Sequence, residues 1–154
     1  MGGEVVKEII TDKAILQLEC TSLDCTPSTW TDSLHVKQVV EDLQDTAKAH
    51  KQKCLGLAAN QIHELDPIFV FKVGALGMFV PILNPKVISV GGGMKNGSEG
   101  CLSLPGEVKM VRRHKEIKIQ YFDWLLEEEV IRKFKGLEAR IIQHELDHLR
   151  GILI

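Results

Sequence analysis

The sequence predicts an α+β fold, in which antiparallel or mixed β-sheets pack around a C-terminal core helix with one further long helix near the N-terminus. Strand-like stretches dominate the middle of the chain, and helical patterns lie on either side of them. This order is typical of α+β proteins and not of alternating βαβ units. No repeat or linker divides the 154 residues, so we expect residues 1–154 to form a single domain.

The N-terminal third contains one predicted helix. The segment Thr11–Trp30 is expected to be irregular, with turn signals between residues 22 and 28. Three good N-cap residues follow at Thr31–Ser33. Apolar residues then recur at helical spacing up to about His50, at Val36, Val39, Val40, Leu43 and Ala47. This spacing predicts an amphipathic helix that faces the core.

The middle of the chain is predicted to be rich in strands. Cys54–Ile62 is a small-residue loop or strand, and Ile68–Val73 and Met78–Val90 are strands with prolines at edges or bends. Gly91–Gly93 and Gly97 predict a hairpin tip or a mobile loop, because no Gly-Lys-Ser/Thr follows to make a phosphate cradle. The later predicted elements are strands at Val108–Val111, Glu116–Phe122 and Glu129–Phe134, a turn near Asp123-Trp124, and a helix at about Leu137–Arg150.

The final helix carries a metal-binding pattern. Leu137, Ile141, His144 and His148 step by 4, 3 and 4 residues, so they share one stripe that is expected to face the core. Two imidazoles one turn apart, about 6 Å between Cβ atoms, can bind one cation. Glu145 flanks the same face and completes the His-Glu-x-x-His pattern. The alternative is a pair of core histidines satisfied by backbone carbonyls.

A catalytic metal site generally has three protein ligands and one position for water. The six residues after His148 include no His, Asp, Glu or Cys, so the third ligand is expected upstream. Cys101, which lies between glycines, is the best candidate. The rival thiols are Cys54 and the pair Cys20/Cys25, which would make a separate structural zinc site.

Three segments resemble, in order, the motifs of peptide deformylases, the enzymes that remove the formyl group from the N-terminal formylmethionine of new proteins. Leu55–Gln61 resembles the Gly-x-Gly-x-Ala-Ala-x-Gln segment of that family, and Glu99–Ser103 resembles its Glu-Gly-Cys-Leu-Ser segment. Gln143–His148 resembles its Gln-His-Glu-x-x-His helix. Together the three motifs frame residues 54–151.

The resemblance implies a role for each matching residue. The metal ligands correspond to Cys101, His144 and His148, and the catalytic acid/base corresponds to Glu145. In the implied reaction a water on the metal attacks the formyl carbon, Glu145 moves the proton to the leaving amine, and formate is released. Iron(II) is the implied native metal, and zinc, nickel or cobalt is expected to substitute for it.

Further positions take supporting roles by the same resemblance. The side-chain amide donor to the oxyanion corresponds to Gln61, and a backbone N–H donor corresponds to Leu102. Glu99 and Arg113 match a supporting ion pair of the family. Asp147 either belongs to the same network or is a solvated carboxylate on the helix. The residues expected to line the methionine pocket are Leu55, Gly56, Leu104 and Ile141.

The sequence departs from the family in two places. Cys54 replaces the first glycine of the first motif, so the turn must avoid glycine-only angles or be strained. This second thiol would compete for the metal or be oxidised. The family commonly continues past the metal-binding helix, whereas this chain stops at Ile154, as in shortened phage-encoded members. Ribosome contacts attributed to that extension are therefore not carried over, and only transient proximity to the ribosome is expected.

Composition narrows the functional classes further. The net charge of −2 argues against direct nucleic-acid binding, and apolar stretches far shorter than about 20 residues argue against a membrane span. The N-terminus lacks the pattern of a secretory signal, so we expect a cytoplasmic enzyme, in the host cytoplasm if phage-encoded, that acts on N-formylmethionyl nascent peptides. Two alternatives remain: a general zinc peptidase, and a non-catalytic protein with a structural metal site.

Overall fold

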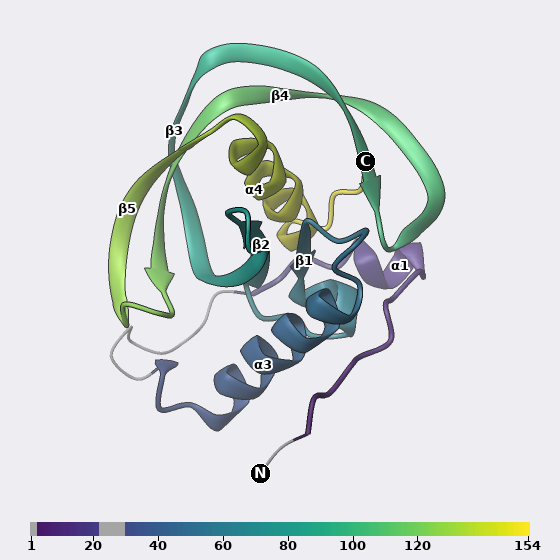
Figure 1. Ribbon diagram of the computed structural model, residues 1–154, viewed down its shortest axis with the longest axis vertical. Coiled ribbons are helices and arrows are strands. Elements are labelled where there is room, and N and C mark those ends of the chain that lie inside the picture. Colours follow the sequence, from purple (N-terminus) through teal and green to yellow (C-terminus); the bar gives the residue numbers. More distant parts are fainter. Residues whose placement is uncertain (1–2, 22–29) are drawn as a thin grey trace.

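The computed structural model describes residues 3–21 and 30–154, and its strands form one antiparallel sheet in the order β1-β2-β3-β4-β5 (Figure 1). The strands are β1 (Gly56–Ala58), β2 (Ile68–Val73), β3 (Met78–Cys101), β4 (Leu104–Asp123) and β5 (Glu128–Lys135). The helices in the described ranges are α1 (Lys13–Leu16), α3 (Leu34–Ala49) and α4 (Gly136–Leu149), with a 3-10 turn, η1, at Ala59–Ile62. The predicted α+β class is confirmed.

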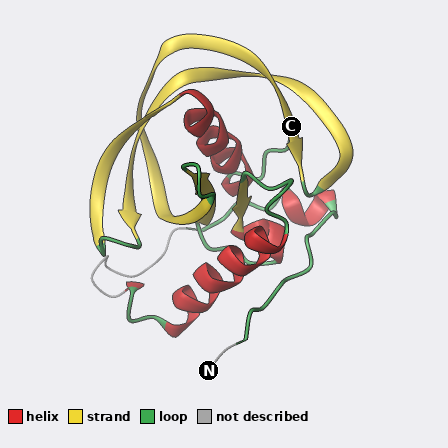
Figure 2. Cartoon of the chain, viewed as in Figure 1, coloured by secondary structure: helices red, strands yellow, loops and turns green. Residues whose placement is uncertain are grey.

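Helices α3 and α4 lie on opposite sides of the short strands β1 and β2, and α4 lies beneath the arch of the long strands (Figure 2). Strand β2 separates two apolar cores. Ile68 and Val70 belong to the core beside α3, whereas Phe69 and Phe71 belong to the core beside α4. Alternate side chains of a strand point to opposite faces, so β2 is apolar on both.

Helix α3 forms where its pattern predicts it. The Ser33 hydroxyl accepts a hydrogen bond from the Val36 N–H at 3.3 Å, which satisfies one of the free donors at the helix start. The five apolar residues of the predicted stripe are all buried. This helix therefore forms the wall of the first core.

The glycine-rich segment is not a hairpin tip or a loop, as the sequence had indicated, but part of β3. Gly91 pairs with Glu116 and Gly97 pairs with Val111 across the β3–β4 ladder. Gly92 and Gly93 have φ angles of 73° and 74° and lie at a register shift. Glycine tolerates these angles, so a bulge bends the strand without ending the pairing.

Two smaller expectations were also wrong. The short helix α1 forms within Thr11–Trp30 because Asp12 accepts a hydrogen bond from the Ala14 N–H at 2.9 Å and Leu16 is buried. Leu137 does not face the core, because 62% of its surface is exposed. The turn signals between residues 22 and 28, and Cys25, lie outside the described residues. In the described part of the chain, no helix is long and apolar enough to cross a membrane.

Gly151 provides a test of how the N-terminal segment packs. It follows α4 with φ 73°, and an added Cβ would collide with the Gln17 carbonyl. We expect Gly151→Ala to lower the free energy of unfolding by more than the ~1 kcal/mol typical of such backbone angles alone. Gly74→Ala is the matched control, since Gly74 has φ 70° and nothing within 4 Å of an added Cβ. Equal losses in urea unfolding would contradict this packing.

Candidate metal centre

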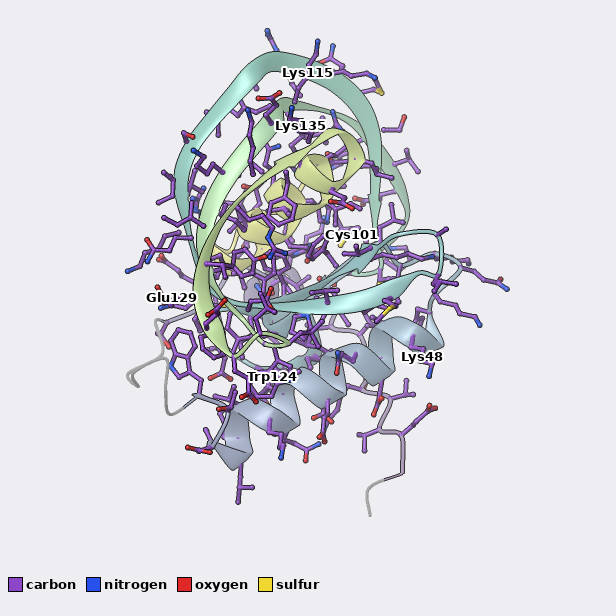
Figure 3. All side chains as sticks on the ribbon, turned by 60° about the vertical axis from the view of Figure 1, so that its left-hand side comes forward. Lys48, Cys101, Lys115, Trp124, Glu129 and Lys135 are labelled. Atoms are coloured by element: carbon purple, nitrogen blue, oxygen red, sulfur yellow. The ribbon has the colours of Figure 1, made fainter. Side chains whose placement is uncertain are left out.

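Three potential ligands from distant segments meet where the end of β3 approaches α4. Cys101 is the last residue of β3, is half-buried, and lies beside α4 in Figure 3. Its Sγ is 3.3 Å from His148 Nε2, which is 3.1 Å from His144 Nε2. Two nitrogens bound tetrahedrally to one zinc ion would be about 3.3 Å apart. The donor set of two imidazoles and one thiol therefore fits a divalent cation.

The helix places both imidazoles on one side, and a buried amide holds its C-terminal turn. His144 and His148 are one turn apart on α4. The Asn60 side-chain amide, from η1, donates to the His148 carbonyl at 2.6 Å and to the Leu16 carbonyl at 3.3 Å. Asn60 thus fixes the end of the histidine-bearing helix α4 to the N-terminal segment.

A buried carboxylate orients the first imidazole. Glu99 Oε1 is 2.9 Å from His144 Nδ1, so the ring donates its Nδ1–H and turns Nε2 toward the other two ligands. Arg113 donates from Nη2 to Oε1 at 2.8 Å and from Nε to Oε2 at 3.0 Å. Burial alone would raise the pKa of Glu99, but hydrogen bonds from His144 and Arg113 outweigh it and lower the pKa to about 2. Glu99 is therefore a carboxylate at every physiological pH.

The ion pair that the sequence assigned to Glu99 and Arg113 extends to α4. Arg113 Nη1 donates to Asp147 Oδ2, and the Asp147 side chain is 24% exposed. The structure thus places Asp147 in the network and not in solvent alone. Arg113, on β4, links the Cys101-bearing strand to the histidine-bearing helix.

The second imidazole is kept neutral. His148 is buried, and its Nδ1 has no hydrogen-bond partner. Burial lowers its pKa to about 3, and the neighbouring charges of His144 and Arg113 lower it too. A neutral imidazole has the free lone pair that a metal ligand requires.

Glu145 lies between the histidines in sequence and beside them in space. It is 2% exposed, and its Oε2 has no hydrogen-bond partner. Burial raises its pKa to about 7. Gly56 permits this position, because an added Cβ there would lie 2.7 Å from Glu145 Oε1. A buried carboxyl with this pKa is suited to take up and return a proton near neutral pH.

The amide side chain of Gln61 is held from two sides. Its Oε1 accepts the Ala58 N–H at 2.9 Å, and its Nε2 donates to Ser103 Oγ at 3.0 Å. The same Nε2 lies 3.4 Å from Cys101 Sγ. Leu102 lies in the turn between β3 and β4, directly after Cys101. Both residues face the same cleft.

A cleft of about 650 Å³ opens onto the candidate ligands. Cys101, His144 and Glu145 contribute to its wall. The four residues that the sequence assigned to the methionine pocket also line it: Leu55, Gly56, Leu104 and Ile141. The structure thus brings an apolar wall and the polar centre into one space, as substrate sites generally require.

Cys54 is in this cleft but not in the ligand group. Among the described residues, the group that contains Cys101 has only His144 and His148 as further members within 4.8 Å. The Cys54 thiol donates to the Gly56 carbonyl at 3.2 Å, and burial raises its pKa to about 12. Residue Cys54 does not have a positive φ angle, so the turn at this position needs no glycine.

Sequence reasoning missed three residues of the site. Ser103 fixes Gln61, Asn60 holds the end of α4, and Arg140 donates to Glu99 Oε2 at 2.6 Å. Ser103 and Asn60 lie inside recognised motifs, but no pattern tells a hydroxyl or amide which distant partner it will meet. Arg140 precedes His144 by one helical turn, which was the available signal.

Two imidazoles and a thiol that lie together beside a buried carboxyl, next to one cleft, are typical of a metal-dependent hydrolase. The chain belongs to the polypeptide deformylase family, whose model matches residues 6–154. Its members remove the formyl group from N-formylmethionine peptides.

Similar proteins cover most of the chain. The peptide deformylase of Clostridium beijerinckii is 40% identical over 116 residues, which are 75% of this chain and 82% of that protein. The crystal structure of peptide deformylase from Ehrlichia chaffeensis aligns with TM-score 0.84 and 31% identity, over 97% of this chain and 86% of that one. A Met-Ala-Ser-bound class I type b peptide deformylase from Acinetobacter baumannii aligns with TM-score 0.84 and 28% identity, over 98% and 97% of the two chains.

The raised pKa of Glu145 predicts a specific pH dependence of stability. The folded protein favours the protonated carboxyl, so this contribution to stability is fully present below the ordinary pKa of 4.5 and is lost as pH rises to about 7. We expect the free energy of unfolding of the metal-free protein, relative to Glu145→Gln, to fall across that window. Urea unfolding at a series of pH values measures it. A pH-independent difference would contradict the raised pKa.

Proposed function

We propose that residues 1–154 form one catalytic domain, in which Cys101, His144 and His148 hold a single divalent cation for deformylation. The observation that carries this proposal is the convergence of Sγ and two Nε2 atoms beside the buried Glu145. When bound, the cation supplies Lewis acidity that lowers the pKa of a water molecule. Iron(II) is the native metal in this proposal, with zinc, nickel or cobalt as substitutes, because a thiolate and two imidazoles suit all four.

Glu145 acts as the general acid/base. Its buried carboxyl, with a pKa raised to about 7, takes the proton of the attacking water and then delivers it to the departing amine. The unpaired Oε2 leaves one acceptor for that proton. Because Gly56 approaches Glu145 Oε1 so closely, the carboxyl has little freedom to turn away from the reacting atoms.

Gln61 and Leu102 stabilise the negative charge on the formyl oxygen. The Ala58 N–H holds the Gln61 carbonyl oxygen, which directs the amide nitrogen toward the cysteine side of the centre. The Leu102 N–H supplies the second donor from the turn after β3. Donors fixed before the reaction need no reorganisation, and the loss of one typically costs about 100- to 1,000-fold in rate.

The apolar wall of the cleft selects the substrate. Leu55, Leu104 and Ile141 receive the methionine side chain of an N-formylmethionyl nascent peptide. Gly56, whose lack of a side chain makes room for the Glu145 carboxyl, lines the same cleft beside them. Since this substrate is made in the cytoplasm, we place the enzyme there, in transient proximity to the ribosome, without contacts to nucleic acid or membrane.

Replacement of Glu145 separates chemistry from metal binding. We expect Glu145→Ala to retain the cation but to lose formate release from formyl-Met-Ala-Ser, because the proton has no acceptor. Formate release and metal content of the same sample measure both. The wild type should release formate from formyl-Met-Ala-Ser and leave Met-Ala-Ser intact. Release of amino acids without formate would favour a general peptidase, and full activity of the variant would remove Glu145 from the mechanism.

The two cysteines of the cleft offer a matched pair of variants. Cys101→Ala is expected to lose the cation and with it formate release, because one of three ligands is gone. Cys54→Ala should keep both, because the Cys54 thiol bonds only to the Gly56 carbonyl. Metal analysis after anaerobic purification measures the difference. Metal loss in Cys54→Ala would instead indicate a closed site with four protein ligands.

A further inference from the structure

Arg140 makes a set of contacts that the proposed mechanism does not use. It lies on α4, one turn before His144, and its side chain is 15% exposed. Its Nη1 donates to Glu99 Oε2 at 2.6 Å and to the Val111 carbonyl at 2.9 Å, and its Nη2 donates to the Lys95 carbonyl at 2.7 Å. One guanidinium thus joins the helix to both long strands.

Gly97 makes the room for this guanidinium. An added Cβ at Gly97 would lie 2.7 Å from Arg140 Cζ and 2.9 Å from its Nε. Gly97 pairs with Val111, and Lys95 pairs with Arg113, so the carbonyl acceptors come from neighbouring positions of one ladder. The guanidinium therefore occupies the space that a side chain at residue 97 would need.

The contacts of Arg140 connect the two segments that carry the candidate ligands, β3 and α4. Glu99, its carboxylate partner, is two residues before Cys101, and His144 is four residues after Arg140. Glu99 Oε2 accepts from Arg113 and Arg140, and Oε1 accepts from Arg113 and faces His144. The four contacts fill the acceptor sites of the carboxylate.

We infer that Arg140 is a positioning residue for the metal ligands, and that its guanidinium requires the space left by the missing side chain of Gly97. By fastening α4 to β3 and β4, the guanidinium sets the distance between the cysteine sulfur and the two imidazoles, and it fixes the carboxylate that orients His144. A lysine cannot replace it fully, because one ammonium lacks the planar fork that reaches three acceptors on two strands. This inference rests on the proposed ligand set.

The test measures zinc affinity of the full chain by competition with a chromophoric chelator. We expect Arg140→Ala to weaken zinc binding about 10- to 100-fold, the usual cost of losing a group that orients a ligand. Arg140→Lys should recover part of this loss. Arg132→Ala is the matched control, because Arg132 also pairs with a carboxylate on this sheet, Asp123 at 3.9 Å, outside the cleft. It should bind zinc as the wild type does.

Gly97→Ala tests independently whether the Arg140 guanidinium needs the space at residue 97. We expect it to weaken zinc binding in the same range, because the new Cβ displaces the guanidinium. The double variant with Arg140→Ala should be no weaker than Arg140→Ala alone, since the clash has then been removed. Gly91→Ala is the control on the same strand, where an added Cβ meets only Glu116 Oε2 at 3.7 Å. Circular dichroism of each variant confirms folding, and if Arg140→Ala does not fold, Arg140→Lys and Gly97→Ala carry the comparison.

The outcomes separate this inference from the proposed function. Cys101→Ala, titrated in parallel, reports zinc bound elsewhere, such as at the group of exposed His35 with half-buried Glu64 and Asp66. If the wild type binds no more zinc than Cys101→Ala, the ligand set itself is wrong. If the wild type binds zinc and Arg140→Ala binds it equally well, only the role of Arg140 is overturned. Wild-type zinc affinity in Gly97→Ala would overturn the inference that Arg140 needs the space at Gly97.

Discussion

The buried Glu99 carboxylate is the interaction on which the centre depends. It lies two residues before the candidate cysteine ligand and faces His144, so the strand that carries the sulfur also orients an imidazole of the helix. Arg113 and Arg140 reach it from β4 and α4. A carboxylate is costly to bury unless an opposite charge lies nearby and its oxygens accept hydrogen bonds. Here two guanidinium groups supply the opposite charge, and together with one imidazole N–H they donate hydrogen bonds to both oxygens.

The charges of this network balance. Glu99 and Asp147 carry two negative charges, and Arg113 and Arg140 carry two positive charges, at pH values where the carboxyls are ionised. Burial lowers the pKa of His144, but hydrogen bonds to Cys101 and Glu99 outweigh it and raise the pKa to about 10, so a cation that binds there would displace a proton from this ring. Glu145 is treated in the opposite way to Glu99: its Oε2 has no partner, and burial raises its pKa to about 7. Two carboxyls on one centre thus take different roles through their surroundings.

Local patterns predicted α3, β2 and the last helix well, because cap residues and apolar spacing act within a few residues. The histidine pair was found for the same reason, since helical geometry alone brings residues 144 and 148 together. The glycine-rich part of β3 was not found, because glycine weakens the strand pattern while the pairing partner lies elsewhere in the chain. Arg140 was missed for a similar reason: its partners come from two strands whose register only the fold establishes.

The two cysteines of the cleft have different surroundings, which favour Cys101 over Cys54 as the proposed metal ligand. Cys101 Sγ lies 3.3 Å from His148 Nε2 and 3.4 Å from the Gln61 amide nitrogen, so it faces the candidate centre. The Cys54 thiol instead donates to a carbonyl, and burial beside Glu145 raises its pKa to about 12. The thiolate form of Cys54 is therefore disfavoured, and with it both metal binding and oxidation. A cysteine at this glycine position can thus be tolerated beside the candidate metal centre as a small apolar residue.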